Sequence, residues 1–261
     1  MDLRTSVLME LSKYTSNKQS IFSEADGFIA RHEAQGIKLL CPEDYPEITR
    51  DIPTILFAKG DVSLIHARSA AIIGSREATD HGKRVARRLG NIMAESGICV
   101  VSGLAVGIDA AGHTGVLEAG GKTIAVLPSP LDCVLPKCNR GLAEKILEKG
   151  GLLLSEYPLG HDVLKRNYFE RDRIQAALSA AVIVVESGLN SGTLHTAAFA
   201  RKYGKPLYCY ENRRIYGESD IQGNRLLISE GAFPLEGKSD ISKLITYLIQ
   251  GQSNVKRISE Q

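Results

Sequence analysis

Three short segments of this chain combine glycine with hydroxyl residues between an apolar run and the helix predicted to follow it. A buried strand that breaks into such a turn and then opens a helix exposes backbone N–H groups that can bind phosphate. For a single turn, a purely conformational role for the glycine explains the pattern equally well. Because three such turns occur and one carries an arginine, the sequence predicts a phosphate-binding protein. The segments are Gly74-Ser75-Arg76, Ser102-Gly103-Leu104 followed by Gly107, and Ser191-Gly192-Thr193.

Arg76 lies inside the first of these turns. Its planar guanidinium offers five donors that can fork onto a phosphate group. A salt bridge to Glu77 or Asp80 is the alternative role for this side chain. The phosphate role is the favoured interpretation.

A second basic group follows two aromatic residues in the segment 168–173. Arg171 and Arg173 are predicted phosphate ligands, with Arg173 ahead, although Asp172 could neutralise one of them. Tyr168 and Phe169 are the candidates for base stacking, which single-stranded nucleic acids require in addition to positive charge.

Acid–base chemistry is the competing interpretation of several other residues. Asp109 and His113 are spaced i, i+4 and so share one face of a predicted helix. No nucleophile or metal ligand accompanies them, so a helix-capping aspartate and a core histidine are favoured. Glu156 and Glu186 at strand ends are likewise predicted to hold backbone N–H groups or an arginine. We expect no catalytic residues.

Composition limits the classes of protein to which the chain can belong. The 261 residues are 43% hydrophobic and carry a formal net charge of +2, so nucleic-acid affinity must come from a local cluster of charge. No apolar run is long enough for a membrane span. The five cysteines show no disulfide or zinc spacing, so no metal and no cofactor are expected. A reduced, cytoplasmic protein is the simplest expectation.

Apolar runs and helical patterns alternate along most of the chain, which predicts an α/β doubly wound, mostly parallel sheet with helices on both faces. Residues 1–35 are expected to form a short helical stub, 36–235 the main domain, and 236–261 a helix and frayed tail without a winged helix. Strands are predicted at 37–40, 54–58, 70–73, 98–101, 123–127, 152–154, 181–185 and 206–210. Helices are predicted near 79–95, 108–119, 139–149, 170–179, 191–203, 223–230 and 239–250.

The ordered motifs between residues 36 and 235 resemble the DprA/Smf family of DNA-processing proteins. The resemblance implies an extended Rossmann-like domain that binds single-stranded DNA, delivers it to a RecA-type recombinase and forms a homodimer. It also implies a role in DNA processing, natural transformation or recombination without catalysis. The motifs are Gly74-Ser75-Arg76, Ser102 to Asp109, Gly120-Gly121, Ser155-Glu156-Tyr157-Pro158, Arg171-x-Arg173 and Ser191-Gly192-Thr193.

Departures from the family pattern keep a second hypothesis open. Asp172 stands where the family has asparagine, and Pro128 and Pro130 remove two backbone donors after a predicted strand. The fold is also similar to that of LOG-type nucleoside monophosphate phosphoribohydrolases, but Thr196 occupies the position of their catalytic glutamate. A nucleotide-binding sensor, or a LOG-like hydrolase, is therefore the alternative.

Overall fold

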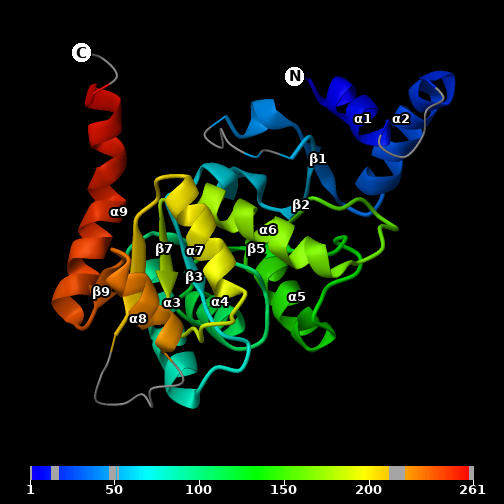
Figure 1. Ribbon diagram of the computed structural model, residues 1–261. Coiled ribbons are helices and arrows are strands. Elements are labelled where there is room, and N and C mark those ends of the chain that lie inside the picture. Colours follow the sequence, from blue (N-terminus) through cyan, green and yellow to red (C-terminus); the bar gives the residue numbers. More distant parts are fainter. Residues whose placement is uncertain (1, 13–17, 47–50, 52, 212–220, 259–261) are drawn as a thin grey trace.

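The computed structural model describes residues 2–12, 18–46, 51, 53–211 and 221–258. A nine-stranded sheet crosses the described residues in the order β1-β2-β6-β5-β4-β3-β7-β8-β9 (Figure 1). The seven strands from β6 to β9 run parallel, whereas β1 and β2 extend one edge antiparallel. The strands are β1 (Lys38–Leu40), β2 (Leu56–Gly60), β3 (Ser69–Ile73), β4 (Cys99–Ser102), β5 (Thr123–Leu127), β6 (Leu152–Ser155), β7 (Ala181–Val184), β8 (Leu207–Tyr210) and β9 (Phe233–Leu235).

Helices cover both faces of this sheet, as the doubly wound pattern predicts. The helices are α1 (Leu3–Leu11), α2 (Lys18–Glu33), α3 (Asp80–Glu95), α4 (Ile108–Glu118), α5 (Arg140–Glu148), α6 (Lys165–Leu178), α7 (Thr193–Lys202), α8 (Gln222–Ser229) and α9 (Lys238–Ile258). Successive residues of β3 separate the two faces: Ile72 packs with α3, α4 and α9, whereas Ile73 packs with α6, α7 and α8. The latter three helices lie in front in Figure 1.

The amino-terminal helices pack against the antiparallel edge of the sheet. Val7 and Phe28 join Phe57 of β2 in one apolar cluster with residues of α5. His32 of α2 is buried and accepts a hydrogen bond from the backbone N–H of Leu159, 3.1 Å away. These contacts tie the first helices to the chain that precedes α6.

The strand order reverses beside β3, because the chain runs from β3 through β4 and β5 to β6 and then returns to β7 on the other side. In open α/β sheets, ligands bind outside the carboxyl ends of the strands at such a switch point. The turns after β3, β4 and β7 all lie at this edge. The topology therefore brings together the three segments that the sequence singles out.

The structure differs from the predicted elements in three places. Helix α6 begins at Lys165, five residues before the predicted start at 170, because its N-cap is Leu164, which offers no capping side chain as a signal. Helix α9 continues to Ile258 where a frayed tail was expected from 251; residues 259–261 lie outside the described residues. Strand β9 was not predicted, since three residues with a proline give too little pattern. No described helix is both long and apolar enough to cross a bilayer.

Candidate functional site

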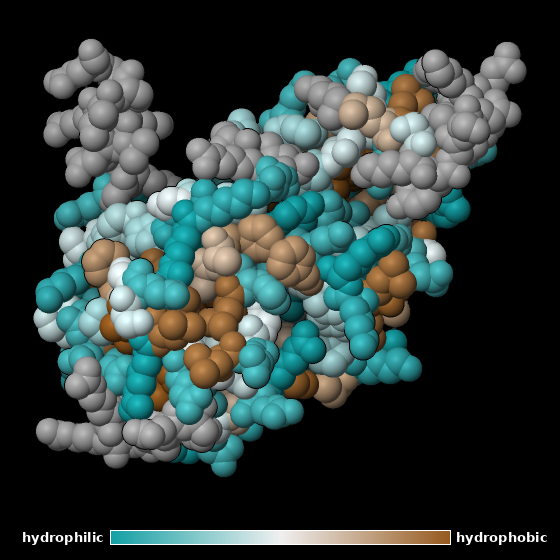
Figure 2. Space-filling view, viewed as in Figure 1, coloured by the Kyte–Doolittle hydropathy of each residue, from teal (hydrophilic) through white to brown (hydrophobic). Residues whose placement is uncertain are grey.

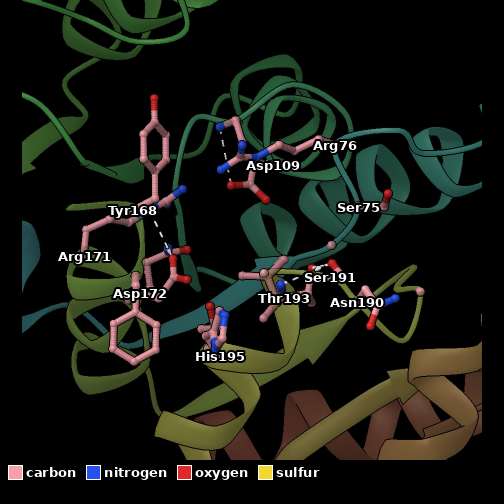
Figure 3. A pocket seen from close by; sticks show the side chains of 18 of the residues that line it. Ser75, Arg76, Asp109, Tyr168, Arg171, Asp172, Asn190, Ser191, Thr193 and His195 are labelled. Atoms are coloured by element: carbon pink, nitrogen blue, oxygen red, sulfur yellow. Dashed lines mark hydrogen bonds and ion pairs between the residues drawn. The ribbon is translucent and has the colours of Figure 1, made fainter. Parts of the chain in front are cut away.

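A cavity of about 600 Å³ opens at the carboxyl ends of β3 and β7. Its walls come from the turn after β3, the start of α4, helix α6 and the loop that leads into α7 (Figure 3). Most of the predicted phosphate ligands line it. They are Gly74, Ser75, Arg76, Arg171, Ser191, Gly192 and Thr193, together with both predicted stacking residues, Tyr168 and Phe169.

The turn after β3 contacts both of the other turns. The backbone N–H of Ser75 donates to the carbonyl of Glu186 at 2.7 Å, and the N–H of Ile108 donates to the carbonyl of Ser75 at 3.2 Å. Gly107 has a φ of +83°, and a Cβ atom there would lie 2.3 Å from the carbonyl oxygen of Ser75. The turn after β4 therefore needs glycine at 107 in order to pack against the turn after β3.

Arg76 and Tyr168 form one wall of the cavity. The guanidinium carbon of Arg76 lies 4.9 Å from the centroid of the Tyr168 ring, a cation–π arrangement. Arg76 is exposed, and among the described residues no carboxylate forms an ion pair with it, Glu77 and Asp80 included. Its donors are thus available to a ligand.

A smaller cavity of about 140 Å³ lies next to the first. Arg76, Ala105, Tyr168 and Arg171 line both cavities, so the Arg76–Tyr168 pair stands between them. The smaller cavity is otherwise lined by Gly103, Val106, Pro128, Leu135 and Pro136.

A cluster of buried charges forms the floor of the larger cavity. Arg171 is 4% exposed, and its Nε lies 3.1 Å from Oδ1 of Asp172. Burial raises the pKa of Asp172 to about 7, against the opposing effect of Arg171. Burial also raises the pKa of Asp109, whose Oδ2 accepts a hydrogen bond from the backbone N–H of Gly103 at 3.0 Å. The floor therefore changes its charge near neutral pH.

The amino terminus of α7 faces the same cavity. The side chain of Ser191 accepts a hydrogen bond from the backbone N–H of Thr193 at 3.2 Å and donates one to its hydroxyl at 2.9 Å. The positive end of the helix dipole favours an anion at this position. Asn190 and His195 add polar side chains to the rim (Figure 3).

Five predicted ligands lie outside the larger cavity, and four of them belong to the turn after β4. Ser102 is fully buried and donates to the carbonyl of Ile72 at 2.6 Å, while Leu104 is buried with a φ of +57°. Gly107 packs under the Ser75 turn, and Gly103 lines only the smaller cavity, where a Cβ would overlap Arg171. These residues shape the turns around the site. That they touch a ligand stays a prediction.

Arg173 also lies apart from both cavities. Its guanidinium forms a two-pronged pair with Glu156, with distances of 2.8 Å and 2.5 Å, and donates to the carbonyl of Glu170 at 2.6 Å. The structure thus places Arg171 at the site and Arg173 in a structural ion pair, the reverse of the order expected from sequence. Ligand contact by either arginine stays a prediction.

The acid–base candidates make structural contacts. His113 is fully buried; its Nδ1 donates to the Thr123 hydroxyl at 2.7 Å, since that hydroxyl itself donates to a carbonyl. Burial lowers the pKa of His113 to about 3, which keeps the ring neutral. Glu186 accepts hydrogen bonds from the backbone N–H and hydroxyl of Thr79 at 2.8 Å and 2.7 Å. In the described part of the chain, no cluster of three His, Cys, Asp or Glu side chains could hold a metal ion.

Several residues of the cavity were not predicted from the sequence. Lys165 is the most important, because it adds a cation one helical turn before Tyr168. A helix predicted to begin at residue 165 would have placed this lysine one turn before Tyr168. Gln175 lies one turn after Arg171 and donates to Asp172 at 3.1 Å. His195 has no sequence signal beyond its place in the turn-to-helix segment.

Comparison with known proteins adds independent information. The family model of DNA recombination-mediator protein A matches residues 38–246. Protein Smf of Synechocystis is 36% identical over 242 residues, which cover 84% of this chain and 60% of that protein. The DNA processing protein DprA of Streptococcus pneumoniae is 38% identical over 200 residues, which cover 77% of this chain and 69% of that protein. The chain thus spans less than two thirds of the Synechocystis relative.

Two solved structures share the fold. The X-ray structure of DprA from Streptococcus pneumoniae superposes with a TM-score of 0.72 at 29% identity and covers 92% of both chains. A structure of DNA processing protein A from Helicobacter pylori, described for its single-stranded DNA binding mode, gives a TM-score of 0.71 at 30% identity. It covers 82% of this chain and 96% of that one.

Proposed function

Because this chain belongs to the DNA recombination-mediator protein A family, we propose that it binds single-stranded DNA in the cavity at the carboxyl ends of β3 and β7. A phosphate group would lie between Arg76 and the amino terminus of α7. The neighbouring bases would stack on Tyr168 or Phe169. The Helicobacter pylori relative, whose structure is described for single-stranded DNA binding, supports this choice of ligand.

One observation carries the proposal: an exposed arginine without an ion pair among the described residues lies over an aromatic ring at the mouth of the cavity. Single strands are bound by such combinations of cations and π-faces, whereas a duplex hides its bases. The helix terminus at Ser191–Thr193 supplies the second anion-binding element on the opposite wall.

We further propose that the protein acts without catalysis. Asp109 accepts hydrogen bonds from backbone N–H groups in the floor of the cavity, and His113 donates to Thr123 and lines neither cavity, so both have structural partners. Thr196 is buried at the cavity, where a LOG-type hydrolase has its glutamate. Its hydroxyl is a weak base and cannot replace a carboxylate.

Family membership supports the wider role. We propose that the protein works in the cytoplasm as a homodimer, protects single-stranded DNA and loads a RecA-type recombinase onto it. These steps need surfaces beyond the cavity. Co-sedimentation with a RecA-type protein on DNA, and sedimentation of the free protein, test the two partners separately.

Fluorescence anisotropy with labelled oligonucleotides tests the ligand. We expect the wild type to bind single strands in preference to duplex, with affinity that falls steeply with salt. Arg76→Ala should weaken binding and lower the salt slope by about 0.7, the value for one phosphate contact on a single strand. Arg88→Ala, an exposed arginine on α3, is the matched control. Selective binding of a free mononucleotide, without oligonucleotide binding, would favour the nucleotide-sensor hypothesis instead.

A further inference from the structure

A row of aromatic rings leads from the cavity along helix α7. Its members are Phe169, His195, Phe199 and Tyr203, and we refer to them as the aromatic row. The ring of Phe169 lies 4.8 Å from that of His195 and 5.4 Å from that of Phe199, measured between centroids. Phe199 in turn stacks on Tyr203 at 6.0 Å with an interplanar angle of 27°.

The row begins in the cavity and ends outside it. Phe169 and His195 line the cavity, whereas Phe199 and Tyr203 do not. His195, Phe199 and Tyr203 are spaced by four residues, so they follow one face of α7 for about 12 Å. The row therefore connects the proposed phosphate site with the far end of the helix.

Helix packing accounts for only part of this row. The buried contact beneath it is built from small residues, Ala176 of α6 with Ala197 and Ala200 of α7, all fully buried. Phe199 and Tyr203 pack against this layer and are half-buried, whereas His195 is exposed and Phe169 is 46% exposed. Apolar surface is visible where α6 and α7 meet (Figure 2). Exposing rings in a continuous row costs free energy, which a ligand would recover.

The charges beside the row are already paired. Lys202 forms an ion pair with Asp51 at 2.5 Å, and Arg201 pairs with Glu230 at 2.6 Å. Lys202 also lies over the Tyr203 ring, with its Nζ 5.9 Å from the centroid, so the cations at the far end of the row are engaged within the protein. The row's expected ligand is a series of stacked bases with few additional phosphate contacts.

We propose that the aromatic row is a stacking surface for the bases of a single strand as it leaves the cavity. This inference rests on the proposed function, because it assumes that the cavity holds a phosphate of the same strand. The row adds affinity that depends on strand length but little on salt or sequence. Stacking tolerates any base because each has a π-face.

Anisotropy with two oligonucleotide lengths tests the row. A short oligonucleotide of about three nucleotides reaches the cavity alone, whereas a longer one of about ten also covers α7. Phe199→Leu keeps an apolar side chain on the helix but removes the ring, which protects the fold. We expect it to weaken binding of the longer strand by about fivefold or more, with the salt slope unchanged, and to leave the short strand unaffected. Tyr247→Leu, on an exposed tyrosine of α9, is the control.

A strand as long as the longer oligonucleotide, but with abasic sites where it passes the aromatic row, keeps the phosphates and removes the bases that would stack there. It should bind Phe199→Leu and the wild type equally. Equal weakening for both lengths, or a change in the sedimentation of the free variant, would show that Phe199 acts on the cavity or on a contact between copies, and would overturn the proposal. Wild-type protein that binds neither length contradicts the proposed function itself. Normal wild-type binding with no effect of Phe199→Leu contradicts the row alone.

Discussion

The guanidinium of Arg76 lies over the ring of Tyr168, and this pair separates the larger cavity from the smaller one. The two side chains come from elements about 90 positions apart in the chain, the turn after β3 and helix α6. An arginine can bind a phosphate group of a nucleic acid, and an aromatic ring can stack on a base.

A double-mutant cycle measures how far the pair acts as a unit. Arg76→Ala and Tyr168→Leu should each weaken binding of single strands, the latter by about 1–3 kcal/mol if a base stacks on the ring. The double variant should lose less than the sum by about 0.5–1 kcal/mol, because the cation–π contact orients both groups. Anisotropy titrations of the four proteins give the coupling. Strict additivity would mean that the contact has no part in binding.

Affinity for single-stranded DNA should rise as the pH falls from 8 to 6. The pKa of Asp172 is raised to about 7, so its carboxyl gains a proton over this range and the cavity loses a negative charge. A bound phosphate favours that protonated form, and each unit by which it raises the pKa strengthens binding up to tenfold at the lower pH. Asp172→Asn should bind with little dependence on pH. An unchanged pH profile in this variant would exclude Asp172 as the cause.

Gly107→Ala should disturb both folding and binding. The φ of +83° strains any L-residue by about 1–2 kcal/mol, and the new Cβ would also displace the Ser75–Arg76 backbone. Gly97 has a φ of +69° with open space around it, so Gly97→Ala carries the strain alone. We expect only Gly107→Ala to weaken oligonucleotide binding. Urea unfolding and anisotropy on both variants make the comparison, and matching losses of affinity would contradict it.

Glu186→Ala should destabilise the fold by about 2–3 kcal/mol. The carboxylate is buried and accepts two hydrogen bonds from Thr79, which itself caps α3. Glu118→Ala is the control, since solvent screens its exposed pair with Arg87 and the pair should contribute little to stability. Urea midpoints of the two variants test the difference. Equal losses of stability in Glu186→Ala and Glu118→Ala would contradict the prediction.

His113 should make the protein sensitive to acid. Its pKa is about 3 in the folded state against 6.5 as the ordinary value, so the unfolded chain takes up the proton first. The stabilisation is complete above about pH 6.5 and is lost as the pH falls toward 3, by at most about 1.4 kcal/mol per pH unit. In His113→Gln, the free energy of unfolding should depend less steeply on pH between 6 and 4. If the free energy of unfolding depended equally on pH in both proteins, groups other than His113 would cause the sensitivity to acid.

Sequence patterns predicted every parallel strand except β9 to within about two residues, because glycine-bounded β-branched runs leave little choice of structure. They failed where a local signal is lacking. Leu164 gives no cap, so the start of α6 was missed and Lys165 with it. Arg171 and Arg173 are two positions apart on that helix and point in different directions, and only the rotational setting of α6 decides which one reaches the cavity. That setting depends on tertiary packing, which no local pattern records.

The link from Ser75 to Glu186 joins the first and the fifth of the parallel strands in chain order. A nascent chain that has emerged only as far as α6 contains Arg76 and Tyr168 but has no opposite wall against which to hold an anion. In the proposed function, competence to bind thus arises only after the segment from β7 to the start of α7 has been synthesised. The complete site needs strands from both sides of the sheet to be in place. A ligand bound there therefore stabilises the folded sheet and should raise the melting temperature of the protein.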